Sequence, residues 1–204
     1  MIHEYVFLSV PARHHAEASE RLAEYIAKGA AGGRMLGCWA TEVGTLNRIV
    51  LMRGYVTDME FMAERRQLAM ATDPFFCESL MTGYSAEAYL PFSWIDPVPA
   101  GRFGPCYELR TYDLRVGTLP VLMEAWKRKL PARAEMSPVL AAGTALDGPP
   151  RFTHLWPYSS FDERLRIRSE AVKAGIWPPN AFPGSLPPPM QAMICLPLPC
   201  SPLQ

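Results

Sequence analysis

His154 is the residue of this sequence whose side chain is best suited to chemistry. An imidazole titrates near neutral pH, so it can transfer a proton or bind a metal ion. In the strand predicted over 151–158, the residues that alternate with His154 are Phe152, Trp156 and Tyr158, which gives an aromatic face. A histidine on such a face is also a common core residue whose hydrogen bonds are satisfied. Both roles stay open for His154.

Charged and aromatic residues alternate along a neighbouring predicted strand, where Glu108, Arg110 and Tyr112 fall on one face. Arg110, Tyr112, His154 and Trp156 are therefore the candidate ligand-binding residues of one cavity, in which Arg110 supplies charge. A buried Glu–Arg pair that holds two layers together is the alternative. No catalytic residue is assigned.

A secondary candidate group lies around a predicted hairpin. Glu42 and Arg48 stand at its two ends, and Trp39 precedes Glu42 by three residues. A carboxylate and a guanidinium beside an indole could hold a polar ligand at the mouth of an apolar cavity. The alternative is an ion pair that fixes the hairpin turn.

Arg164 and Arg168 are four residues apart on a predicted helix, so their side chains are neighbours that could meet an acidic partner. Glu163 and Glu170 lie nearby in the sequence, which favours a solvated charged face instead. The apolar residues of this helix share one side: Phe161, Leu165 and Val172.

Metal and nucleophile motifs are missing from the sequence. His14 and His15 are adjacent and cannot face one point on a helix, and the five cysteines form no CxxC pair. We therefore expect no protein-borne metal and no cofactor. A haem iron needs a single axial histidine, so haem stays possible but unsupported. Neither a GxSxG turn nor a glycine-rich phosphate loop is present.

Composition excludes several classes of protein. The 204 residues carry 20 basic and 20 acidic side chains, and this zero net charge argues against a nucleic-acid partner. Hydrophobic residues make up 49%, which is enough for a core. No apolar run is long enough to span a membrane, and the start of the sequence resembles neither a signal peptide nor a mitochondrial leader. With an odd number of scattered cysteines, we expect reduced thiols and a cytoplasmic location.

The sequence contains an internal repeat. Residues 48–55 align with 151–158 at an offset of 103, and Glu4 matches Glu108 at an offset of 104. Each copy has the predicted order strand–helix–strand–strand–helix–strand. The ranges in the first copy are 2–9, 16–27, 35–43, 47–55, 58–70 and 85–92. In the second copy they are 107–112, a helix that opens at 117–118, 139–146, 151–158, a helix after 159–160, and 190–197.

This order predicts an α+β fold of two tandem ferredoxin-like (βαββαβ) repeats, which pack sheet to sheet as an intramolecular dimeric α+β barrel. We expect a first repeat over 1–96, a linker over 97–104 and a second repeat over 105–204. Residues 177–204 hold nine of the 21 prolines, and we expect them to form an irregular extension on the surface. A homodimer is expected, since such barrels keep exposed strand edges.

The motifs of both copies resemble the NIPSNAP family. The second copy carries Tyr107-Glu108-Leu109-Arg110-Thr111-Tyr112 and His154-Leu155-Trp156, and the first carries Gly37-x-Trp39 with Glu42-x-Gly44-x-Leu46-Asn47-Arg48. The resemblance covers about 2–92 and 105–197 and implies the dimeric α+β barrel that small oxygenases and haem-degrading enzymes also use. Animal members of the family are mitochondrial and are linked to adaptor roles. No secure reaction comes with the resemblance.

Three functions remain open. The first is the binding of a small, partly hydrophobic ligand in a cavity between sheet and helices. The alternatives are an oxygenase-like or isomerase-like enzyme and a protein-interaction adaptor. The two copies differ, because Ala142 and Ala145 stand in the second where Trp39 and Glu42 stand in the first. We therefore expect one functional cavity, in the second half.

Overall fold

The computed structural model describes residues 1–28, 32–179, 186–187 and 190–204. The first half consists of β1 (Ile2–Ser9), α1 (His15–Ala27), β2 (Arg34–Val43), β3 (Arg48–Tyr55), α2 (Asp58–Met70) and β4 (Gly83–Pro91). The second half consists of β5 (Cys106–Asp113), α3 (Leu119–Ala134), β6 (Ala141–Ala145), β7 (Arg151–Tyr158), α4 (Phe161–Lys173) and β8 (Met190–Pro197). Short 3-10 turns lie at Ala12–His14, Pro74–Phe76 and Glu78–Leu80.

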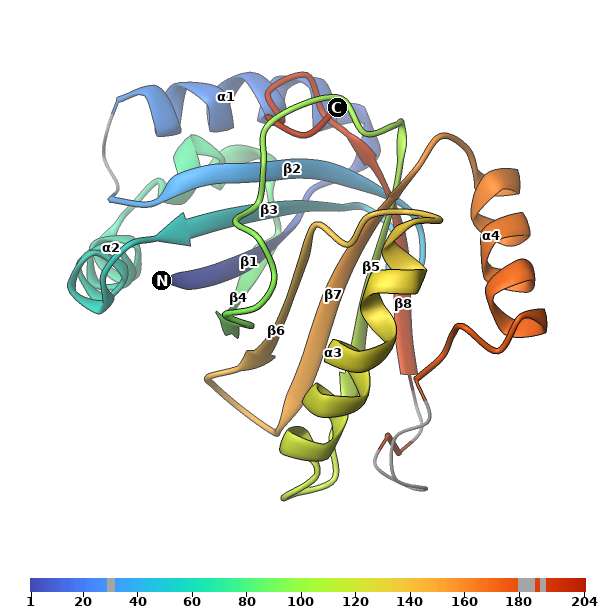
Figure 1. The fold of residues 1–204 in the computed structure, drawn as a ribbon. Helices are drawn as coiled ribbons and strands as arrows, with labels where there is room; N and C mark the ends of the chain where they lie inside the picture. Colours follow the sequence, from blue (N-terminus) through green and yellow to red (C-terminus); the bar gives the residue numbers. More distant parts are fainter. Residues whose placement is uncertain (29–31, 180–185, 188–189) are drawn as a thin grey trace.

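The eight strands form a closed barrel in the order β1-β3-β2-β8-β5-β7-β6-β4 (Figure 1). The strands of the two halves join edge to edge, since β2 pairs with β8 and β4 pairs with β6. The expectation of free strand edges is therefore wrong. Closure pairs the backbone groups that an open edge would leave without partners.

Side chains from both halves fill the inside of the barrel. Alternation along β1 and β5 sends Tyr5, Phe7, Tyr107 and Leu109 inward, where they pack with Trp39 in one buried cluster. The ring centroids of Trp39 and Tyr107 lie 5.4 Å apart, so the two halves share a core. Trp39 therefore belongs to the inside of the barrel.

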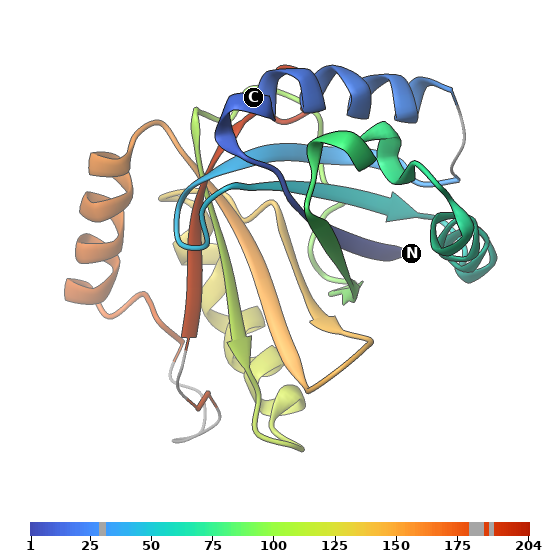
Figure 2. The ribbon, with the colours of Figure 1, turned by 180° about the vertical axis from the view of Figure 1, so that it is seen from behind.

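The outer faces of the strands are covered by helices. Figure 1 shows α3 and α4 outside the strands of the second half, and α1 and α2 outside those of the first. The C-terminal residues lie beside α1 in both views (Figures 1 and 2). None of the helices in the described part of the chain is long and apolar enough to cross a bilayer.

Capping side chains explain where two of the helices begin. Thr57 accepts a hydrogen bond from the backbone N–H of Glu60, whose carboxylate accepts one from the backbone N–H of Thr57. This capping box starts α2. Ser160 accepts from the N–H of Glu163 and starts α4 in the same way.

The buried face of α4 is not its most apolar one. Phe161, Leu165 and Val172 are exposed, whereas Ile167 and Ala171 are buried. The face turned to the sheet is Arg164-Ile167-Arg168-Ala171, whose spacing forms one helical stripe. Arg164 and Arg168 contact the buried carboxylate of Glu108. These contacts stabilise this orientation of α4 more than burial of its larger apolar side chains would.

The Pro-rich extension is described only in part. Most of the triple proline at 187–189 lies outside the described residues, as do 180–185. The final segment, from Leu198 to Gln204, is tied to residues of the expected linker. The N–H of Gly101 donates to the carbonyl of Pro202 at 3.0 Å, and the N–H of Gln204 donates to the carbonyl of Gly101 at 2.9 Å.

Candidate functional site

Strand pairing brings the four candidate residues of the second half together. In the antiparallel ladder of β5 and β7, Arg110 lies opposite His154 and Glu108 lies opposite Trp156. These residues and Tyr112 face outward, toward α3 and α4, because the residues between them point into the barrel. The candidate site therefore lies between the sheet and the helices.

His154 lies inside a shell of aromatic rings and is 2% exposed. The ring centroids of Trp126, Phe152 and Tyr112 lie 4.9, 5.1 and 5.2 Å from that of the imidazole. The indole Nε1 of Trp156 donates to Nδ1 of His154 at 2.5 Å. The single proton of a neutral imidazole must then sit on Nε2.

The Nε2 atom of His154 is buried and has no hydrogen-bond partner among the described residues. Burial, followed by the positive charges of Arg110, Arg168 and Arg133, holds the pKa of His154 well below its usual value. The ring is therefore neutral near pH 7. It presents one buried N–H donor that an oxygen atom of a ligand could satisfy.

Three arginines surround one buried carboxylate beside this shell. Glu108 is fully buried, and its Oε1 accepts from Arg110 at 2.6 Å and from Arg164 at 2.5 Å. The Oε2 atom of Glu108 lies 3.6 Å from Arg168. Burial alone would raise the pKa of Glu108, but the hydrogen bond from Arg164 and the arginine charges lower it below its usual value. Arg164 and Arg168 thus meet an acidic partner, and the expectation of a solvated charged face is wrong.

The three arginines leave positive charge unbalanced. Glu108 is the only acidic side chain within 4 Å of Arg110, Arg164 or Arg168 in the described part of the chain. One negative charge therefore faces three positive charges, an excess of two. Arg168 is the most accessible, with 39% of its side chain exposed, and the Nε atom of Arg164 is buried without a partner among the described residues. Such a group favours an anion.

The corresponding place in the first half has a different balance of charge. Glu4 lies opposite Arg53 in the β1–β3 ladder, and the Arg53 guanidinium binds both Glu4 and Glu64. Arg65 also donates to Glu4, at 2.5 Å. Arg65 also lies 3.5 Å from Asp147, so three carboxylates meet the two guanidinium groups and the first half lacks the positive charge excess found around Glu108.

The structure does not bring the secondary candidates together. Trp39 points into the barrel, whereas Glu42 is exposed. The β2–β8 register shifts between Thr41 and Val43, which places Glu42 at the irregularity. Glu42 and Arg48 form no ion pair in the described part of the chain. Within that part, no three metal-ligating side chains are grouped to hold an ion.

His3 is a buried histidine that sequence reasoning did not single out. It is 5% exposed, and two cavities of about 360 and 250 Å³ share it with Met1 and Pro97. Burial and the N-terminal ammonium lower the pKa of His3 to about 4, and its Nε2 has no partner among the described residues. No motif surrounds His3. Its alternation with Tyr5 and Phe7 was the one available signal that it points inward.

Comparison with known families decides what this half of the chain is. The model of the NIPSNAP family matches residues 107–202. Residues 107–202 are a NIPSNAP domain. The domain contains Arg110, Tyr112, His154 and Trp156, together with the arginines of α4. The resemblance seen in the sequence is therefore confirmed for the second half.

Curated relatives agree with this assignment of the NIPSNAP domain. A NipSnap homolog of Dictyostelium discoideum is 28% identical over 149 residues, which cover 72% of this chain and 66% of the relative. NipSnap homolog 2 of Mus musculus is 34% identical over 122 residues, which cover 58% of this chain and 43% of the relative. The chain thus spans less than two thirds of the length of these relatives.

Solved structures show that the fold extends over the whole chain, beyond the NIPSNAP domain. A "putative monooxygenase" of Lactobacillus acidophilus NCFM has a TM-score of 0.63 at 8% identity. The superposition covers 96% of this chain and 92% of that protein's chain. A protein of the same description from Fusobacterium nucleatum has a TM-score of 0.64 at 12% identity, and the superposition covers 97% of this chain and 92% of that protein's chain. An anthrone oxidase-like protein has a TM-score of 0.60 at 10% identity, covering 97% and 91%. At these identities the likeness concerns the fold alone.

Proposed function

We propose that the NIPSNAP domain binds a small, partly hydrophobic molecule that carries an anionic group, between the sheet and helices α3 and α4. The observation that supports this most is the unbalanced positive charge around Glu108, next to the aromatic shell of His154. A site of this kind takes its specificity from a few polar groups beside an apolar wall.

The proposed roles follow from position. Arg110 and Arg164 hold the anionic group, because 13% of each side chain is exposed and Glu108 already orients both. Tyr112 and Trp156 contact the apolar body. The Nε2–H of His154 donates to an oxygen atom of the ligand. Glu108 positions the arginines and does not itself touch the ligand.

The experiment is a titration with 8-anilino-1-naphthalenesulfonate, an aromatic sulfonate. We expect Arg164→Gln to weaken binding about tenfold, because one charge-assisted hydrogen bond is lost. Arg166→Gln is the matched control, since Arg166 lies on the same helix but pairs with Glu170. The proposal fails if wild type and both variants bind alike. If Arg48→Gln abolishes binding while Arg164→Gln does not, the site lies in the first half.

An oxygenase-like or isomerase-like enzyme is the second candidate. It is favoured by the whole-chain fold similarity to the proteins described as monooxygenases and as anthrone oxidase-like. An absorption spectrum of the purified protein tests for a coloured cofactor such as haem or flavin, and an oxygen electrode tests for oxygen uptake with aromatic substrates. A colourless protein without oxygen uptake would leave the binding function as the better account.

We also propose that two copies of the chain form a homodimer through the exposed apolar side of α4. Phe161, Leu165 and Val172 lie there, with 46–60% of each residue exposed. The same side would serve the adaptor alternative. Light scattering at micromolar concentration tests the dimer, and Leu165→Glu should give a monomer. A wild-type monomer would contradict the proposal and favour the adaptor.

Two further proposals concern location and origin. The five free cysteines support a cytoplasmic location, which fluorescence microscopy of a tagged chain would test.

The matching element order of the two halves, with Glu4 and Glu108 at equivalent positions, supports tandem ferredoxin-like repeats. They correspond to domains over 1–96 and 105–204 with a linker over 97–104. Superposition of 2–92 on 105–197 tests the repeat.

A further inference from the structure

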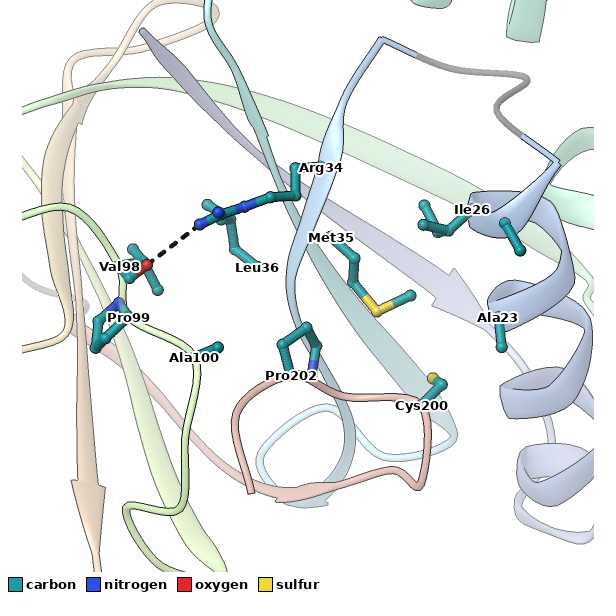
Figure 3. A pocket seen from close by; sticks show the side chains of 11 residues that line it. Ala23, Ile26, Arg34, Met35, Leu36, Val98, Pro99, Ala100, Cys200 and Pro202 are labelled. Carbon is teal, nitrogen blue, oxygen red and sulfur yellow. Dashed lines mark hydrogen bonds between the residues drawn. The ribbon is translucent and has the colours of Figure 1, made fainter.

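A cavity of about 430 Å³ lies beside α1 and β2, and its lining residues are none of those of the aromatic shell around His154. Figure 3 shows this cavity. Its walls are apolar, with Ala23 and Ile26 from α1 and Met35 and Leu36 from β2. Its volume falls in the lower part of the range of small-molecule sites, about 300–1,000 Å³.

Two segments that are far apart in the sequence complete the cavity. Val98, Pro99 and Ala100 come from the expected linker, and Cys200 and Pro202 come from the C-terminal segment (Figure 3). Backbone hydrogen bonds hold these segments to each other, and the backbone N–H of Cys38 donates to the hydroxyl of Ser201 at 2.9 Å. The cavity is therefore built by fixed backbone, which lowers the entropy cost of binding.

Arg34 is the charged group of this cavity. Its Nη2 donates to the carbonyl of Val98 at 3.4 Å, as Figure 3 shows, and this is a long hydrogen bond. In the described part of the chain, no acidic side chain lies within 4 Å of Arg34. The cavity thus combines an apolar wall with a guanidinium group that has no ion-pair partner.

Cys200 supplies a thiol to the same cavity. The other four cysteines are buried, and all five belong to the described residues, so Cys200 is the accessible one. A hydrogen bond from the thiol of Cys38 lowers the pKa of Cys200 to about 7. A low pKa favours the reactive thiolate. The rate of Cys200 alkylation therefore reports whether the cavity is occupied.

We infer that this cavity binds an aliphatic monocarboxylic acid, with the carboxylate on the guanidinium of Arg34 and the hydrocarbon chain along Ile26, Met35 and Leu36. Charge complementarity selects the carboxylate, since Arg34 has no ion-pair partner among the described residues and the rest of the wall is almost wholly apolar. The cavity volume of about 430 Å³ favours a fatty acid with a hydrocarbon tail of medium length over one with a long tail. This site is independent of the proposed function around Glu108.

The test measures alkylation of Cys200 by iodoacetamide, followed by peptide mass spectrometry, with decanoate as the probe below its micellar concentration. Saturating decanoate should slow alkylation about tenfold or more. Octanoate should bind about fifteenfold more weakly than decanoate, because it is two methylenes shorter and each buried methylene changes affinity about fourfold. Since Cys200 lies in this cavity, the readout does not depend on the site around Glu108.

Two variants and one uncharged analogue complete the design. Arg34→Gln should need about tenfold more decanoate for equal protection, whereas Arg66→Gln, an exposed arginine on α2, should behave as wild type. Decan-1-ol should protect wild type and Arg34→Gln equally. An unchanged alkylation rate with decanoate would overturn the inference, and so would equal protection of wild type and Arg34→Gln by decanoate.

Discussion

Glu4 and Glu108 occupy equivalent positions in the two halves, and each is fully buried beneath the helices of its own half. Glu4 belongs to a cluster in which the guanidinium groups of Arg53 and Arg65 meet three carboxylates. Glu108 is instead the single carboxylate, among the described residues, that meets three guanidinium groups. The two equivalent carboxylates therefore differ in the number of acidic side chains that share their arginines.

Arg53→Met should destabilise the protein by about 3–5 kcal/mol, because it leaves Glu4 and Glu64 buried without their shared partner. Urea denaturation measures the change. Arg66→Gln, on the exposed side of α2, is the control and should stay within about 0.5 kcal/mol of wild type. A loss below about 1 kcal/mol for Arg53→Met would show that the ion cluster is dispensable.

Stability should fall as the pH decreases from 6.5, since His3 binds a proton in the unfolded chain at 6.5 but in the folded chain only at about 4. The contribution of His3 is fully present above pH 6.5 and is lost as the pH falls through 4. Between pH 6.5 and 5 the loss is about 2 kcal/mol. His154 acts in the same direction. Urea midpoints of wild type and His3→Gln across this range should diverge, and parallel curves would contradict the effect.

Cys200 should be the first thiol to react in the native protein. Cys38, Cys77, Cys106 and Cys195 are buried, and burial raises the pKa of Cys195 and Cys77 to about 12. Iodoacetamide at pH 8 followed by intact-mass measurement should give one fast addition and four that wait for unfolding. Two additions at similar rates would show that another thiol is accessible.

At a concentration where light scattering shows the monomer, Ile167→Ala should cost about 2–5 kcal/mol, while Leu165→Gln should change stability by less than about 0.5 kcal/mol. Ile167 is buried against the sheet, whereas half of Leu165 is exposed. Thermal unfolding of the two variants compares the two sides of α4. The reverse order of costs in the monomer would contradict the assignment of Ile167 to the side of α4 that faces the sheet.

Loss of a helix cap should be measurable on its own. Thr57→Ala removes the acceptor for the N–H of Glu60 and should cost about 1 kcal/mol. Thr57→Ser keeps a hydroxyl acceptor and should be nearly neutral. Thermal unfolding of both variants tests the cap, and an equal loss for both would point to the lost methyl group instead of the hydrogen bond.

Local signals predicted most elements of the fold. The ranges 2–9, 58–70, 151–158 and 190–197 agree with the strands and the helix observed, because alternation and the capping residues act within a few positions. The pairing of β2 with β8 and of β4 with β6 joins distant segments, and no local pattern records it. The sequence therefore predicted a barrel but not the pairing of its strand edges.

The candidate site was predictable only along its strands. Alternation placed Arg110, Tyr112, His154 and Trp156 on one face. The contact of Arg164 and Arg168 with Glu108 depends on how α4 packs, and apolar spacing alone favours the opposite side of that helix. Trp126, from α3, reaches His154 across the layer, and its helical spacing with Leu122 and Leu130 indicates only that it is buried.

Closure of the barrel also has a consequence during synthesis of the chain. The edge of β2 is paired by β8, so it stays open until residues near 197 have been made. The first half therefore leaves the ribosome with an unpaired strand, which other chains could bind. Completion of the barrel has to wait for the last strand, and folding of this chain should be a late, cooperative event.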